Sequence, residues 1–227
     1  MHTDDSLGAS RPSFGAFFGK LIFSPRRFYR QYGELLRRED PPYFLPVFLL
    51  YALSETTVRL DSQILKWQMR FEESGPGWAQ HWAIYWMLVV ILSLPVGYIA
   101  YAIARWWYRL RLKWSKAGPE ATKHLAGHLY LYTEAIYRWL ILIEAVLNTV
   151  LRSSPATDDA LADWLLLPLP LAWLILAFYS IYVSYTGVRM LTQAKRGRAL
   201  FWFVIVPGLA YFLAMAAGVM IGLLAAS

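Results

Sequence analysis

Five stretches of this chain are apolar over a length that can cross a lipid bilayer as an α-helix, and this feature limits the possible folds most strongly. Spanning the hydrocarbon core takes about 20 predominantly apolar residues. The stretches lie near residues 44–60, 82–104, 129–151, 164–188 and 199–226. Hydrophobic residues make up 58% of the 227 residues and charged residues only 16%, whereas about 25% of a soluble domain is charged. We therefore predict an all-α integral membrane protein with five transmembrane helices.

The chain divides into two parts at the prolines that follow Asp40. We expect residues 1–42 to form a cytoplasmic or interfacial amphipathic segment, and residues 43–227 to form the five-helix transmembrane domain. The first apolar stretch is the weakest candidate span because it is short and carries Glu55 and Arg59. Charged side chains are costly in hydrocarbon, so the other four stretches are the stronger candidates.

Basic residues alternate between the connections of the five stretches. Lysine and arginine gather before the first stretch, after the second and after the fourth, whereas acidic residues offset the bases of the other connections. The positive-inside rule then places the N-terminus in the cytoplasm and the C-terminus outside. An odd number of spans requires the same arrangement, which supports the count of five.

Two short amphipathic helices are predicted before the first span. Ser13 can cap the first, and Ser24 followed by Pro25 is a typical helix start that predicts the second. Aromatic and leucine side chains share one face of each helix, and arginines lie mostly elsewhere, a pattern that suits the membrane–water interface. Two interpretations stay open: the helices sense or shape the cytoplasmic leaflet, or they anchor the bundle and pack on its loops.

The net charge of +7 at pH 7 bears on the partners. In a chain this apolar, basic charge favours anionic lipid headgroups on the cytoplasmic side, and we expect no nucleic-acid partner. The candidate lipid contacts flank the first and second spans. They are Arg26, Arg27, Arg30, Arg109, Arg111 and Lys113.

Ionisable residues within the predicted spans form the candidate functional site. On a helical wheel Glu134, Arg138, Glu144 and Asn148 fall on one side of the third span. We expect Glu134 to pair with Arg138, four residues later. In the first span Glu55 should lie at the depth of Glu144, with Arg59 able to reach either carboxylate. This polar set is either a relay or headgroup cavity, or a salt-bridge network that holds two helices in register.

Other features are weaker. Ala214, Gly218 and Gly222 are small residues four apart, a spacing that allows close helix packing within the bundle or against a partner. His124 and His128, with Glu120 before them, could hold zinc only if a further ligand converges, and we favour a solvated or headgroup-facing role. The chain has no cysteine and no recognisable catalytic motif. We expect no cofactor, no metal and no enzymatic activity.

Several short motifs follow one another in a characteristic order over residues 14–226. They are Ser24-Pro25 with Phe28, Pro42 and Pro46, Gly118 before the Tyr130–Tyr137 stretch, Tyr185-Thr186-Gly187-Val188-Arg189, Arg198-Ala199, and Pro207-Gly208. In order and topology the chain resembles the Yip1 family of five-span membrane proteins, and its bacterial branch in particular. The resemblance implies a cytoplasmic N-terminal region and five spans, and it supplies no catalytic residues.

The expected function follows from these features. We predict a non-enzymatic scaffold or accessory subunit of a membrane complex in a bacterial inner membrane, with other subunits or a second copy as partners. The alternative is a small transporter or permease subunit for ions or lipids. That function would use Glu55, Arg59, Glu144 and Asn148.

Overall fold

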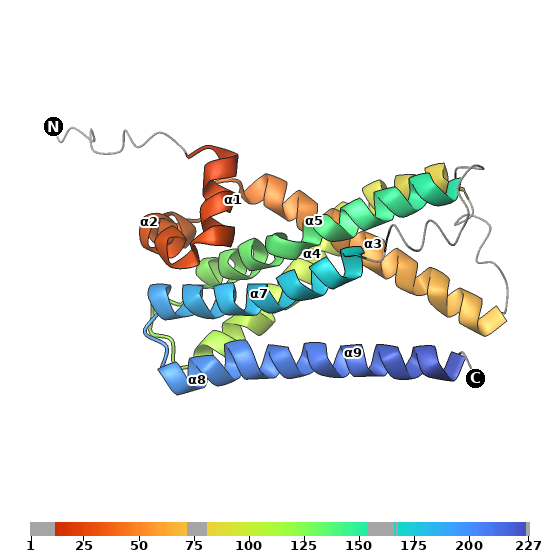
Figure 1. Ribbon diagram of the computed structural model, residues 1–227. Helices are drawn as coiled ribbons and strands as arrows, with labels where there is room; N and C mark the ends of the chain where they lie inside the picture. Colours follow the sequence, from red (N-terminus) through yellow and green to blue (C-terminus); the bar gives the residue numbers. More distant parts are fainter. Residues whose placement is uncertain (1–11, 72–80, 154–165, 167, 226–227) are drawn as a thin grey trace.

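The computed structural model describes residues 12–71, 81–153, 166 and 168–225, and every regular element among them is a helix (Figure 1). Two short helices come first, and long helices follow. In chain order they are α1 (Phe14–Phe23), α2 (Pro25–Arg37), α3 (Phe44–Phe71), α4 (Trp82–Trp114), α5 (Lys123–Ser153), α7 (Pro168–Leu191), α8 (Arg196–Leu200), the π-helix η2 (Phe201–Ile205) and α9 (Val206–Ala225).

The long helices form an antiparallel bundle. Figure 1 shows α3, α5 and α9 running in one direction and α4 and α7 in the other. Three of the described segments are long and apolar enough to cross a membrane: Trp82–Trp114, Pro168–Leu191 and Arg196–Ala217. These correspond to the second, fourth and fifth predicted spans. The described part of the chain is therefore all-helical, with three candidate membrane-spanning helices.

The helices α3 and α5 occupy the other two predicted spans. Each is long enough to cross a bilayer. Charged residues lower the apolar character of both helices, so neither is among the three candidate membrane-spanning segments. The helices also extend beyond the predicted stretches. The α3 helix continues to Phe71 and α4 to Trp114, because a helix continues through polar residues after the apolar stretch ends.

The N-terminal helices begin where the sequence predicts. The Ser13 side chain accepts a hydrogen bond from the amide of Ala16, 3.4 Å away, and so caps α1. Pro25 is the first residue of α2, where its missing amide hydrogen costs nothing. The chain then leaves α2 before Pro41 and Pro42 and enters α3 at Phe44.

The aromatic faces of α1 and α2 are buried against the bundle. Phe17, Phe28 and Tyr29 have at most 1% of their surface exposed. The hydroxyl of Tyr179 on α7 donates to the carbonyl of Ile22 at 2.5 Å. Burial raises the pKa of the Tyr29 phenol well above its ordinary value, so it stays neutral. Figure 1 places the two helices at the same end of the bundle as the α4–α5 and α7–α8 connections. The two helices therefore pack on the bundle, and their role at the membrane stays a prediction.

Two glycines allow the closest helix approaches. A Cβ on Gly97 of α4 would lie 2.3 Å from the Cβ of Ala52 on α3. A Cβ on Gly187 of α7 would lie 2.6 Å from the Tyr29 ring on α2. No side chain fits at such distances, so glycine is required at both positions for the helices to approach this closely.

The π-helix η2 connects α8 to α9, and Pro207 lies just after it. The amide of Val206 bonds to the carbonyl of Phe201, five residues back. In that register the carbonyl of Trp202 would need the amide of residue 207, which proline lacks. The Nε of Arg111 on α4 donates to this carbonyl instead, at 2.8 Å. This hydrogen bond joins η2 to α4.

Candidate functional site

The candidate site is an ionic network between α3 and α5, with Arg138 at its centre. The Arg138 Nη1 lies 3.0 Å from a carboxylate oxygen of Glu55 and 3.2 Å from the Ser54 hydroxyl. Its Nε and Nη2 both lie 2.9 Å from Oε2 of Glu134, one turn back on α5. One guanidinium therefore binds two carboxylates from two helices, in the fork geometry that favours arginine over lysine.

The second arginine of the network is Arg59, which pairs with Glu55 on α3. The Nη2 of Arg59 lies 2.7 Å from the other carboxylate oxygen of Glu55. Two arginines thus balance two glutamates, and no net charge remains. The side chains of Arg138, Glu55 and Glu134 are 9%, 16% and 13% exposed, whereas that of Arg59 is 58% exposed. The inner three groups are therefore shielded from solvent, and their mutual attraction is correspondingly stronger.

Aromatic side chains complete the surroundings of Arg138. The ring of Tyr51 lies 4.2 Å from its guanidinium carbon, a cation–π contact. The hydroxyl of Tyr137 donates to Oε2 of Glu134 at 2.5 Å. Neighbouring hydroxyls on α3 bond to its own backbone, as when Thr56 donates to the carbonyl of Ala52 at 2.9 Å. Every ionic group of the network therefore has a partner.

The expected pairing is confirmed in part and wrong in part. Glu134 and Arg138 pair as the helical spacing predicts. Glu55 does not share a level with Glu144, because the register of α3 against α5 places it beside Arg138. The arginine shared by two carboxylates is therefore Arg138 and not Arg59. Glu144 is half-buried and Asn148 exposed, both farther along α5 and outside this network.

Two hollows flank the network. A surface groove of about 250 Å³ lies between α3, α4 and α5, where Glu55 and Arg59 form part of its wall. A smaller polar cavity of about 70 Å³ lies on the other side of Glu134, between α4, α5, α7 and the start of α9. Arg111, Ser184 and Tyr211 also line it. This cavity is large enough to hold water.

The predicted lipid contacts do not all lie on the surface. Arg26, Arg27, Arg30, Arg109 and Lys113 are exposed. Arg111 instead points into the bundle, where its guanidinium lies 4.3 Å from the Phe203 ring centre and bonds to the Trp202 carbonyl. It serves the fold there and is not free to bind a headgroup. The Pro207 that requires this bond is visible in the sequence, but the pairing of α4 with α9 is not.

The histidines also have structural partners. The Nδ1 of His128 lies 2.8 Å from the carbonyl of Leu36 and donates to it, since a carbonyl can only accept. This bond satisfies one of the free carbonyls at the end of α2. His124 lies 3.6 Å from Glu39. Among the described residues, no three potential metal ligands converge.

The small-residue series lies on α9, and the structure describes the surroundings of only one of its members. Ala214 is exposed on α9. The backbone of Gly218 and Gly222 is helical, and what surrounds these two glycines is not described. Their role in packing therefore stays a prediction.

Comparisons with known proteins find no matching family model, no matching curated protein and no matching solved structure.

Proposed function

We propose that this chain is a non-enzymatic, five-span membrane protein that acts as a scaffold or accessory subunit of a membrane complex. In this proposal α3 and α5 cross the bilayer together with α4, α7 and α9. The N-terminus lies in the cytoplasm and the C-terminus outside, in a bacterial inner membrane. The order of motifs that resembles the Yip1 family supports this topology and location.

The closed ionic network carries the proposal. Glu55 lies 11 residues after Phe44, about 16 Å along α3 at ~1.5 Å per residue, near the middle of a core about 30 Å thick. Charges at that depth are tolerated when they pair inside the bundle. The Arg138 guanidinium binds both glutamates at about hydrogen-bond distance. Such pairing is typical of polar groups that fix helix register, because each group already has its partner.

The distribution of basic residues supports the five-span topology. Arg109 and Lys113 at the end of α4 and Arg198 in α8 lie at the end of the bundle where α1 and α2 pack. Lysine and arginine are enriched on the cytoplasmic side of membrane proteins. A chain with five antiparallel crossings places its N-terminus at this end and its C-terminus at the other.

The sparse packing of α9 supports a role in assembly. In the most apolar part of Arg196–Ala217, which includes the first half of α9, only 11% of the residues are buried, against 44% for α7. Large apolar side chains such as Phe212 and Leu213 are more than half exposed. In the membrane this face contacts lipid, another subunit or a second copy of the chain. A photoactivatable crosslinker attached to a cysteine introduced at Ala214, in native membranes, distinguishes lipid from protein at this face.

The first experiment compares stability with transport. Glu134→Gln should lower the melting temperature in detergent and leave proton and cation flux across proteoliposomes at the level of protein-free vesicles. Arg59→Gln, at the exposed end of the network, is the matched control and should change the melting temperature little. Flux that the wild type supports and Glu134→Gln abolishes, with folding retained, contradicts the scaffold proposal.

One observation favours the second candidate function, a transporter or permease subunit. The polar cavity beside Glu134 brings Arg111, Tyr211 and this carboxylate together within the helices, and water there would offer a path for protons or small ions. A continuous path through the protein would also need an opening past the hydrogen bond of 2.8 Å between Tyr108 and Ser184. Ser184→Val should then raise or lower the flux in proteoliposomes, whereas a scaffold has no flux to change.

A further inference from the structure

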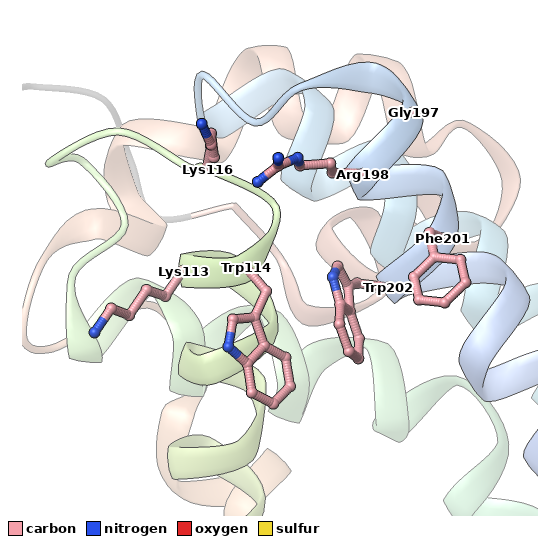
Figure 2. A pocket seen from close by; sticks show the side chains of 7 residues that line it. All are labelled: Lys113, Trp114, Lys116, Gly197, Arg198, Phe201 and Trp202. Atoms are coloured by element: carbon pink, nitrogen blue, oxygen red, sulfur yellow. The ribbon is translucent and has the colours of Figure 1, made fainter.

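A basic and aromatic pocket lies where the end of α4 meets the start of the last helix. Its volume is about 500 Å³. Lys113, Trp114 and Lys116 come from α4 and the turn after it, and Arg198, Phe201 and Trp202 come from α8 and η2 (Figure 2). Residues more than 80 positions apart in the chain therefore build one site.

The pocket carries three cations that pair with no carboxylate in the part of the chain that the structure describes. Among the described residues, no ion pair involves Lys113, Lys116 or Arg198. All three side chains are exposed. Figure 2 shows the guanidinium of Arg198 extending toward the side of the pocket where Lys116 lies. Like charges that converge without a counter-ion repel each other, and an anion between them would remove this repulsion.

The backbone holds these two cations together. The amide of Lys195 donates to the carbonyl of Ser115 at 3.0 Å and so joins the chain before α8 to the end of α4. Lys116 has a φ of 56°, in the left-handed region that a lysine rarely adopts. The turn therefore holds the backbone of Lys116 next to the chain before α8 at some conformational cost.

Aromatic rings form the floor of the pocket. The ring centres of Trp114 and Trp202 lie 4.4 Å apart with their planes at 35°. Phe201 beside them is 46% exposed. Figure 2 shows the two indole rings on the side of the α4 helix and Arg198 and Lys116 on the side of the loops. Tryptophan at the end of a span is typical of the level of lipid headgroups.

We propose that this pocket binds the phosphate group of an anionic membrane phospholipid. Arg198 and Lys116 bind the phosphate, Lys113 adds positive charge at the rim, and the Trp114–Trp202 pair supports the glycerol and the first carbons of the acyl chains. Arginine and lysine are the usual partners of phosphate, and charge-assisted bonds to it are strong. The three positive charges disfavour a headgroup that carries its own cation.

This inference rests on the proposed membrane placement of α4 and α9. Its readout is lipid binding, which does not depend on whether the protein acts as a scaffold or a transporter. A failure to bind lipid would leave the topology standing, and a different topology would appear in the labelling of introduced cysteines.

The test measures binding of soluble probes to the full-length protein in detergent, by native mass spectrometry and calorimetry. The probes are dihexanoylphosphatidylglycerol, dihexanoylphosphatidylcholine and glycerol 3-phosphate. The pocket variant is Lys116→Asn with Arg198→Gln, since asparagine tolerates a positive φ. The control variant is Arg38→Gln with Lys123→Gln, which removes the same charge at exposed positions outside the pocket.

The phosphatidylglycerol probe should bind about tenfold more tightly than either other probe, and the pocket variant should lose about tenfold in that affinity. The control variant should change the affinity less than about threefold, since exposed charges act weakly at a distance. Equal losses of affinity in the pocket variant and the control variant contradict binding at this pocket. Equal binding of glycerol 3-phosphate and phosphatidylglycerol contradicts the proposal that the bound phosphate belongs to a lipid. Melting temperatures near the wild-type value show that the variants are folded.

Discussion

Replacing Arg138 by methionine tests the ionic network most severely, because it removes the centre and keeps an apolar side chain of similar length. Glu55 then retains only Arg59, and Glu134 retains only the hydroxyl of Tyr137. Removing one partner of a buried ion pair costs about 3–5 kcal/mol. For a chain of this size that corresponds to a fall of about 6–20 °C in melting temperature, at ~2–4 °C per kcal/mol.

The triple variant Glu55→Gln, Glu134→Gln, Arg138→Met separates lost charge pairing from lost packing. Replacing a whole buried ionic group by neutral residues is often neutral or stabilising. The glutamine carbonyls can still accept from Arg59 and Tyr137, which retain their positions. The triple variant should therefore recover most of the stability that the single variant loses.

The assay follows unfolding in detergent by the intrinsic fluorescence of the 11 tryptophans. Arg59→Gln is the control, and its loss should stay within about 1 kcal/mol because the side chain is 58% exposed. An Arg138→Met variant as stable as the wild type would refute the reasoning. A triple variant less stable than the single one would also refute it, since uncompensated carboxylates would then not be the cause.

Two further predictions concern helix packing. Gly97→Val should lower the melting temperature, since a Cβ there meets Ala52 at 2.3 Å, whereas Gly208→Val, whose Cβ would meet nothing within 4 Å, should not lower it, because valine favours helix more than glycine does. Equal effects would contradict the close α3–α4 approach. Gly187→Ala should push the Tyr29 ring aside and speed trypsin cleavage within α2, measured in detergent. Cleavage at the wild-type rate would show that α2 does not depend on this contact.

The sequence predicts those parts of the fold that depend on local signals. Ser13 and Pro25 mark the starts of α1 and α2 because capping and a fixed φ act within one turn. The apolar stretches locate the long helices. Their ends are less predictable, since α4 continues to Trp114 through residues that are polar but favour helix.

The arrangement of the helices depends on contacts between distant residues, and this limits what the sequence predicts of the site. The pair of Glu134 with Arg138 follows from one helix alone. The partner on α3 depends on the register between two helices, which Gly97 and Ala52 help to set through α4. That register brings Glu55 to Arg138, although its distance from the start of the span had suggested the level of Glu144.

The topology of α3 and α5 is the claim on which the account depends most, and labelling of single cysteines tests it most directly. The chain has no cysteine of its own, so each label reports one introduced position. Ser6→Cys and Glu120→Cys should react with a membrane-impermeant maleimide only in inverted vesicles, and Ser74→Cys and Ser154→Cys only in intact spheroplasts. Labelling of positions 6 and 74 from the same side, or of 120 and 154 from the same side, would contradict the five-span account.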